Sequence, residues 1–94
     1  MPTATWNGQV IAKTDRFEEV DGNIYFPSAC LRREFFEPSE TKTVCGWKGE
    51  ASYYTVVVDG KRNEDAAWTY PDPKQAAENL RDHVAFWKGI QVSR

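Results

Sequence analysis

Four dipeptides that favour tight turns occur along this chain: Asn7-Gly8, Asp21-Gly22, Asp59-Gly60 and Lys88-Gly89. Asn-Gly and Asp-Gly readily supply the positive φ angles that a two-residue hairpin turn requires. The predicted strands follow one another mostly through short turns and not through helical crossovers, so neighbouring strands are expected to run antiparallel. This spacing predicts a mainly β fold built of antiparallel strands.

The strongest predicted strand covers residues 51–58, where apolar residues occupy both faces, as in a buried central strand. After the turn at Asp59-Gly60, residues 63–70 are expected to return and pair with it as a hairpin. Residues 37–40 (Glu-Pro-Ser-Glu) predict a turn-rich break. Shorter strands are predicted over residues 3–6, 9–13, 23–26, 41–45 and 90–92.

A single short helix is predicted near the C-terminal end. Asp72 is a suitable N-cap, and Pro73 would occupy the first helical position, where its missing N–H costs nothing. Apolar residues then follow at helical spacing on one face: Ala76, Ala77, Leu80 and Val84. We expect this helix to close one end of the sheet structure or to cover one face.

Length and charge exclude several classes of protein. The 94 residues predict one domain spanning 1–94, and a net charge of -2 without a basic block argues against a nucleic-acid partner. No apolar run reaches the roughly 18–20 residues that span a bilayer, so no membrane partner is expected. Without a signal-peptide pattern the chain is expected in the cytoplasm, with Cys30 and Cys45 as free thiols.

Aromatic residues make up 14% of the chain, and its 4 Trp exceed what a core of this size needs. Trp68 and Tyr70 share a face of the returning strand, and the hairpin would bring them beside Tyr53. We expect a pocket between two sheets that binds a flat or cationic small molecule or modified residue. Its predicted ligand-binding residues are Trp47, Lys48, Tyr53, Trp68 and Tyr70. The alternative is that the rings fill a small core and that Lys48 is a solvated turn lysine.

The same stretch supports a second hypothesis, a small enzyme with Cys45 and Lys48 as candidate catalytic residues. A neighbouring lysine lowers the pKa of a thiol and favours the nucleophilic thiolate. The alternative for Cys45 is a small buried hydrophobe at a strand end. His83, the only histidine, is expected near free carbonyls at the end of the helix. No cofactor and no metal are expected, because Cys30, Cys45 and His83 lack the short spacing of metal ligands.

A third hypothesis is an interaction module whose exposed aromatic side chains contact another protein or a second copy of the chain. The sequence leaves a monomer and a homodimer equally open. Concentration-dependent size in solution distinguishes this module from the ligand-binding domain.

Several stretches resemble one protein family over nearly the whole chain. They are residues 45–54 (Cys-Gly-Trp-Lys-Gly-Glu-Ala-Ser-Tyr-Tyr), residues 65–73 (Asp-Ala-Ala-Trp-Thr-Tyr-Pro-Asp-Pro), residues 84–86, and residues 7–8, 10–12 and 25–27. The resemblance is to the bacterial and fungal family called domain of unknown function 427, sometimes labelled nucleotidyltransferase-like. That family usually reads Cys-Pro-Trp-Lys-Gly, and Gly46 stands here in place of the proline, so the turn is expected to be looser.

This resemblance implies a fold more than a function. It implies a tent of two packed antiparallel sheets, similar to methionine-sulfoxide reductase B and to the ligand-binding domain of cereblon. Relatives of that shape often hold zinc with two Cys-x-x-Cys pairs, which are absent here, so no zinc is expected. Nucleotidyl transfer is disfavoured, because Asp59, Glu64 and Asp65 do not form a convincing Mg²⁺-binding constellation.

Overall fold

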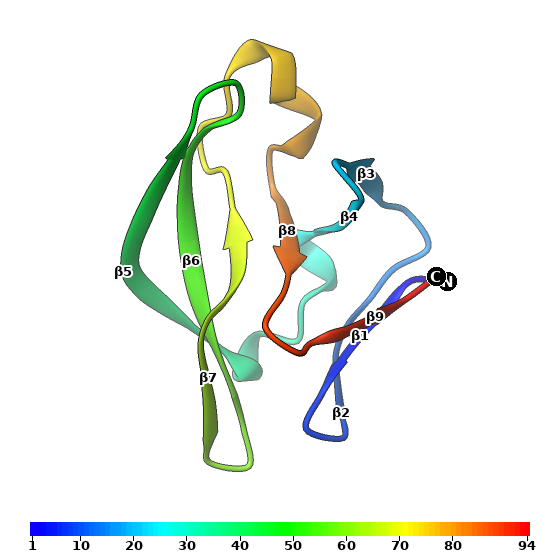
Figure 1. Ribbon diagram of the computed structural model, residues 1–94. Coiled ribbons are helices and arrows are strands. Elements are labelled where there is room, and N and C mark those ends of the chain that lie inside the picture. The colour runs from blue at the N-terminus through cyan, green and yellow to red at the C-terminus, as the bar shows by residue number, and fades with distance from the viewer.

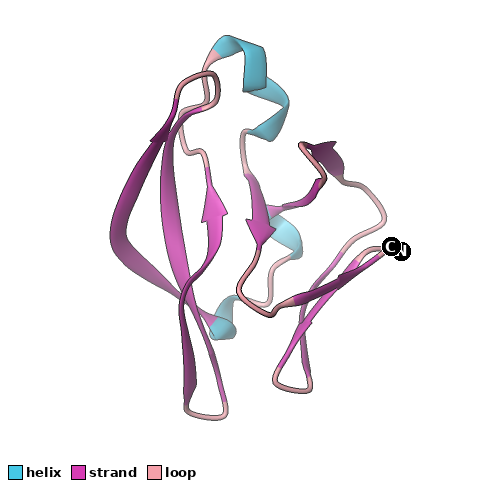
Figure 2. Cartoon of the chain, viewed as in Figure 1, coloured by secondary structure: helices cyan, strands magenta, loops and turns pink.

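The computed structural model describes all residues from 1 to 94 and contains nine strands and three short 3₁₀ helices (Figures 1 and 2). The strands are β1 (Thr3–Trp6), β2 (Gln9–Lys13), β3 (Glu18–Val20), β4 (Asn23–Pro27), β5 (Phe36–Cys45), β6 (Gly49–Val58), β7 (Lys61–Thr69), β8 (His83–Phe86) and β9 (Gln91–Ser93). The helices are η1 (Ser28–Cys30), η2 (Arg33–Phe35) and η3 (Gln75–Leu80). No helix is long and apolar enough to span a membrane.

The strands form two antiparallel sheets, which confirms the predicted fold class. The large sheet has six strands in the order β3-β4-β8-β7-β6-β5, and the small sheet has three in the order β2-β1-β9. β1 lies at the centre of the small sheet, where it pairs with β2 and with β9 from the far end of the chain. Both chain ends therefore meet on the small sheet, as Figure 1 shows.

The predicted central hairpin is present, and its partner strand is longer than expected. β6 and β7 pair on either side of Asp59-Gly60, with Val58 opposite Lys61. Residues 37–40 do not break the chain as predicted, because they lie within β5, which pairs with β6 from Phe36 to Cys45. The turn-favouring residues instead produce an irregularity in the register between Pro38 and Lys42. Proline cannot donate to a ladder, and an edge strand accommodates this loss.

A bulge in β7 changes the register of the central hairpin. Tyr54 pairs with Ala67, but Val56 pairs with Asn63, so β7 carries extra residues between the two pairs. Asp65 lies within this bulge in a left-handed conformation, with φ of 56°. Trp68 and Tyr70 follow the bulge, so their shared face is unaffected by it.

The predicted C-terminal helix is largely wrong. The observed helix η3 begins at Gln75 as 3₁₀ helix, has non-helical backbone angles at Ala77, and receives no side-chain cap from its N-cap residue. Its two buried residues, Ala77 and Leu80, lie three positions apart, which is the repeat of a 3₁₀ helix. Val84, which matched the helical pattern, belongs to β8 and pairs with Thr69 of β7 and Phe26 of β4. Tertiary pairing has overridden the local helical pattern.

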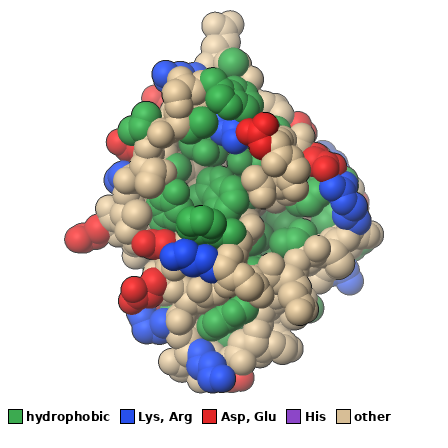
Figure 3. Space-filling model, viewed as in Figure 1, with side chains coloured by type: hydrophobic (Ala, Val, Ile, Leu, Met, Phe, Trp, Pro, Cys, Tyr) green, Lys and Arg blue, Asp and Glu red, His purple; other side chains and the backbone are tan.

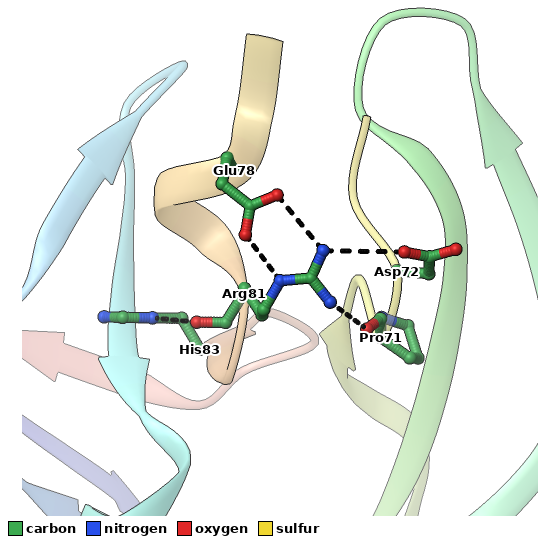
Figure 4. A network of polar contacts seen from close by, with 5 residues as sticks. All are labelled: Pro71, Asp72, Glu78, Arg81 and His83. Atoms are coloured by element: carbon green, nitrogen blue, oxygen red, sulfur yellow. Dashed lines mark hydrogen bonds and ion pairs between the residues drawn. The ribbon is translucent and has the colours of Figure 1, made fainter. Parts of the chain in front are cut away.

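Arg81, directly after η3, ties this helix to the segment that precedes it (Figure 4). Its guanidinium donates two hydrogen bonds to the carboxylate of Glu78, at 2.5 and 3.1 Å, and lies 3.5 Å from Asp72. A further hydrogen bond reaches the carbonyl oxygen of Pro71 at 3.5 Å. His83 was expected near free carbonyl groups at the end of the helix. It lies just after η3, where its Nδ1 donates to the carbonyl oxygen of Arg81 at 2.8 Å.

The large sheet separates two hydrophobic cores. Along β4, the side chains of Ile24 and Phe26 enter one core, and Tyr25 between them enters the other, as strand alternation requires. The first core lies between the two sheets and includes Ala4, Ile11 and Ala12 from the small sheet. The second core lies on the opposite face of the large sheet, beneath η3, and contains Tyr25, Ala51, Tyr70, Ala77, Leu80 and Ala85.

Candidate functional site

An aromatic depression of about 150 Å³ adjoins the second core. It is lined by Lys48, Tyr53, Trp68, Tyr70 and Trp87. Figure 3 shows hydrophobic side chains gathered in the middle of this face of the molecule, over β7 and β8. The predicted location between the two sheets is wrong: Tyr53, Trp68 and Tyr70 pack on the face of the large sheet that is turned away from the small sheet. The space between the sheets holds the first core, and beside it a separate groove of about 350 Å³ that none of the predicted ligand-binding residues line.

Four of the five predicted ligand-binding residues line this depression, and Trp47 does not. The Trp47 side chain lies at the β5–β6 turn, is 44% exposed, and covers the Lys48 ammonium at 5.0 Å from the ring centroid. The pairing of Tyr53 with Trp68 across β6 and β7 accounts for these two positions. Tyr70 directly follows β7, and Lys48 lies in the turn before β6. Ligand binding by these residues stays a prediction.

Trp87 is the lining residue that the sequence analysis missed. Its ring meets Trp68 edge-on at 5.8 Å, and its Nε1 donates to the carbonyl oxygen of Asp65 at 2.5 Å. Its backbone N–H donates to the carbonyl oxygen of Ala66 at 3.0 Å. The apolar run over residues 84–87 is a signal for it, but Val84 is placed on the predicted helix and no strand is predicted there. The strand β8 (His83–Phe86) brings Trp87, which directly follows it, beside β7.

Trp68 is held in place by contacts on two sides. Its ring packs edge-on against Tyr25 at 6.2 Å, and its Nε1 donates to the Tyr25 hydroxyl at 3.3 Å. Trp87 packs against its other side. Edge-to-face aromatic pairs add about 0.5–1.5 kcal/mol each beyond the area they bury. The depression is therefore built around a fixed indole ring.

The turn that carries Lys48 is fastened to the segment before η3. The carbonyl oxygen of Lys48 accepts a hydrogen bond from the backbone N–H of Lys74 at 2.9 Å. In return, Nζ of Lys74 donates to the carbonyl oxygen of Gly46 at 2.7 Å. Gly49 follows with φ of +116°, and a Cβ there would lie 3.3 Å from the carbonyl oxygen of Asp72. Only glycine allows this close approach without strain.

Lys48 is buried, so the alternative of a solvated turn lysine is wrong. The residue is only 6% exposed, and its Nζ forms an ion pair with Asp21 at 2.7 Å. Its ammonium also lies 5.9 Å from the centroid of the Tyr70 ring. Burial alone, the largest effect, would lower the pKa of Lys48, but the hydrogen bond to Asp21 and nearby tyrosine oxygens together raise it. The amine therefore stays protonated within the aromatic cluster.

Tyr70 contributes a second hydrogen-bond donor to the depression. The residue is 6% exposed, but its hydroxyl, which bonds to no other residue, is accessible to solvent, because no buried polar side-chain atom of the chain lacks a partner. Burial raises the pKa of Tyr70 to about 12, so the hydroxyl keeps its proton near neutral pH. Lys48 and Tyr70 thus offer two donors on one aromatic surface.

Cys45 lies next to this arrangement and does not line it. The side chain is half-buried against the second core, and the backbone N–H groups of Lys48 and then of Trp47 lower the pKa of its thiol. Cys30 and Cys45 are both free. His83 lines a separate groove with Pro27, so no histidine lines the depression beside Cys45.

The chain holds no group of three or more His, Cys, Asp or Glu side chains that could bind a metal ion. Among the carboxylates considered for nucleotidyl transfer, Asp65 accepts a hydrogen bond from Thr41 at 2.8 Å. Hydrogen bonds from Ser39 and Thr41 lower the pKa of Asp65. Its position is explained by these contacts within the sheet.

Comparison with known protein families gives a match. The model of a family described as Domain of unknown function (DUF427) matches residues 3–93. No curated protein matches the chain. The description of the family assigns it neither a ligand nor a reaction.

Proposed function

This chain belongs to the family described as Domain of unknown function (DUF427), as its resemblance predicted, and we propose its function from the aromatic depression itself. The domain binds a small molecule, or a modified residue of a larger one, by holding a single flat ring. Tyr53, Trp68 and Trp87 supply the apolar walls, and Lys48 and Tyr70 supply hydrogen-bond donors.

The size of the depression supports one ring and not a larger ligand. Drug-sized ligands occupy pockets of about 300–1,000 Å³, whereas an apolar cavity of about 150 Å³ can hold benzene. A depression of about 150 Å³ therefore matches one aromatic or similarly flat ring. The rest of a larger ligand would lie outside it.

The charge of the site argues against a cationic ligand. Aromatic cages bind quaternary or methylated ammonium groups through the ring faces. Here the Lys48 ammonium already lies over the rings of Trp47 and Tyr70. A second cation would meet like-charge repulsion in a partly desolvated site. The proposal is therefore narrower than the sequence prediction: the ligand is flat, not cationic, and bears a hydrogen-bond acceptor.

One observation carries this proposal, namely that a buried ammonium and the solvent-accessible hydroxyl of a largely buried tyrosine line one aromatic surface. The Tyr70 hydroxyl can donate one hydrogen bond, and no residue of the chain accepts it. This donor is therefore available to a ligand atom that enters the depression. A ring that served only as core would bury its hydroxyl against a partner within the chain.

Binding of benzamide, a flat ring with a neutral acceptor, tests the proposal. We expect a Kd of ~1 mM, corresponding to about -4 kcal/mol, because the probe is a small fragment. Titration followed by tryptophan fluorescence and by NMR measures it. Trp68→Ala should abolish binding, because it removes the central wall.

Trp47→Ala is the matched control, because it removes an indole that lies next to Lys48 without lining the depression. This variant should retain the affinity within about threefold, equivalent to less than 1 kcal/mol. If Trp47→Ala lost as much affinity for benzamide as Trp68→Ala, the placement of the site would be contradicted. Absence of binding by benzamide and by related flat amides would contradict the proposal.

A second candidate function, thiol chemistry at Cys45, is favoured by one observation: two backbone N–H groups lower the pKa of this thiol. The thiolate is the reactive form, so Cys45 should be alkylated by iodoacetamide at a pH below the ordinary pKa of a thiol. The rate is measured in Cys30→Ser, which leaves only Cys45, and compared with that of Cys45→Ser, which leaves only Cys30. If Cys45 reacts no faster than Cys30, thiol chemistry at this position is excluded.

A further inference from the structure

The two partners of the ion pair between Lys48 and Asp21 differ in their exposure to solvent. The side chain of Lys48 is 8% exposed, whereas that of Asp21 is 59% exposed. Asp21 can therefore leave the pair and be hydrated by solvent, but Lys48 cannot follow it into water. If Asp21 leaves, another negative group has to replace it, because an unpaired buried charge is strongly unfavourable.

Resting on the proposed function, we infer that the natural ligand carries an anionic oxygen on or next to its ring, and that this oxygen displaces Asp21 from Lys48. The Asp21 carboxylate then acts as an internal competitor that occupies Lys48 when the ligand is absent. The chemical class is a flat anion such as an aromatic carboxylate.

The position of Asp21 in the fold suits a contact that opens. Asp21 lies in the turn between β3 and β4, and β3 is a three-residue strand at the edge of the large sheet. The backbone of Asp21 is left-handed, with φ of 54°, so it is part of a tight turn that ends the strand. Only Lys48 forms an ion pair with its carboxylate. Movement of this turn would break no ladder of the central strands.

The two donors in the depression suit an anionic oxygen. Lys48 provides a charged donor, and Tyr70 provides a neutral one whose ring lies 5.9 Å from the Lys48 ammonium. Hydrogen bonds to an ionised acceptor are about twice as strong as those between neutral groups. A ligand carboxylate can accept from both donors, whereas the Asp21 carboxylate reaches only Lys48. This difference gives the ligand its advantage over the internal competitor.

An anionic ligand can bind only those molecules in which Lys48 is not paired with Asp21. Its apparent affinity is therefore its intrinsic affinity multiplied by the fraction of such molecules. Asp21→Asn removes the competing charge, and asparagine still tolerates the left-handed turn and can accept a hydrogen bond. Benzoate and benzamide have the same ring and nearly the same shape, and they differ in charge. Their affinities for wild type and Asp21→Asn, measured by NMR titration, therefore test the inference.

Asp21→Asn should bind benzoate about tenfold or more tightly than wild type, because a tethered carboxylate competes at high effective concentration. Its affinity for benzamide should change by less than about threefold, or under 1 kcal/mol. Asp59→Asn is the matched control: it also lies in an Asp-Gly turn with positive φ and removes one negative charge, but it has no ion pair. This control should leave both affinities unchanged.

A measurement on wild type keeps the test independent of how the variant folds. Benzoate should shift the backbone amide signals of Asp21 and Gly22, because their turn is released, and benzamide should not. If benzamide binds but the ratio of the two affinities is the same in wild type and Asp21→Asn, the internal competition is wrong and the proposed function stands. If the turn signals do not respond to bound benzoate, the displacement is likewise wrong. If neither probe binds any form, both proposals fail.

Discussion

Replacing Leu80 with alanine lowers the free energy of unfolding by about 2–5 kcal/mol, the range for truncating a fully buried leucine. Leu80 is 0% exposed and anchors η3 in the second core beside Tyr25 and Tyr70. For a chain of this length, the loss corresponds to a fall in Tm of about 10–30 °C. Thermal unfolding followed by circular dichroism measures it.

Leu31→Ala is the control with identical side-chain chemistry. Leu31 is only partly buried and packs against the first core, so its truncation should cost less than that of Leu80. Benzamide should also bind more weakly to Leu80→Ala than to Leu31→Ala, because Tyr70 loses packing that holds its ring. A fall in Tm for Leu80→Ala no larger than that for Leu31→Ala would show that η3 is not anchored as described.

Gly49→Ala should lower the free energy of unfolding by about 3 kcal/mol, the upper end of the cost of a residue held in a sparsely populated backbone conformation. The φ of Gly49 is +116°, and the added Cβ would press against the carbonyl oxygen of Asp72 at 3.3 Å. The corresponding fall in Tm is about 10–20 °C. Urea unfolding gives the free energy, and heat unfolding gives the Tm.

Gly46→Ala is the matched control for this substitution. It lies in the same turn, its φ is not positive, and a Cβ there would meet nothing within 4 Å. We expect a change in Tm of no more than about 4 °C, because substitutions at such open surface positions usually stay within about 0.5 kcal/mol. Equal losses at the two glycines would contradict the tight contact between Gly49 and Asp72.

The hairpins of the fold could be predicted from the sequence, because a hairpin turn depends on the backbone preferences of neighbouring residues. Asn7-Gly8 and Asp59-Gly60 mark hairpins that the structure contains, because their backbone preferences act over two residues. The segment from Gln75 to Phe86 could not be predicted in this way. Its helical spacing was real, but the pairing of Val84 with β4 and β7 depends on residues far away in sequence.

The site was predictable where it follows from strand alternation and not where it depends on distant segments. Tyr53, Trp68 and Tyr70 share a face because β6 and β7 form the expected hairpin. Trp87 required the correct assignment of β8. Asp21 reaches Lys48 from a distant part of the sequence, and no local pattern indicates this contact. The face of the sheet on which the rings lie is likewise set by how the small sheet packs.

Because the large sheet divides the molecule, its two faces pack into separate cores. Along β8, Val84 and Phe86 point into the core that joins the sheets, whereas Ala85 points to the face that carries the aromatic depression. A substitution at the rim of that depression is therefore separated by the sheet itself from the packing that joins the two sheets. The framework of the fold and the aromatic depression can be altered independently of each other.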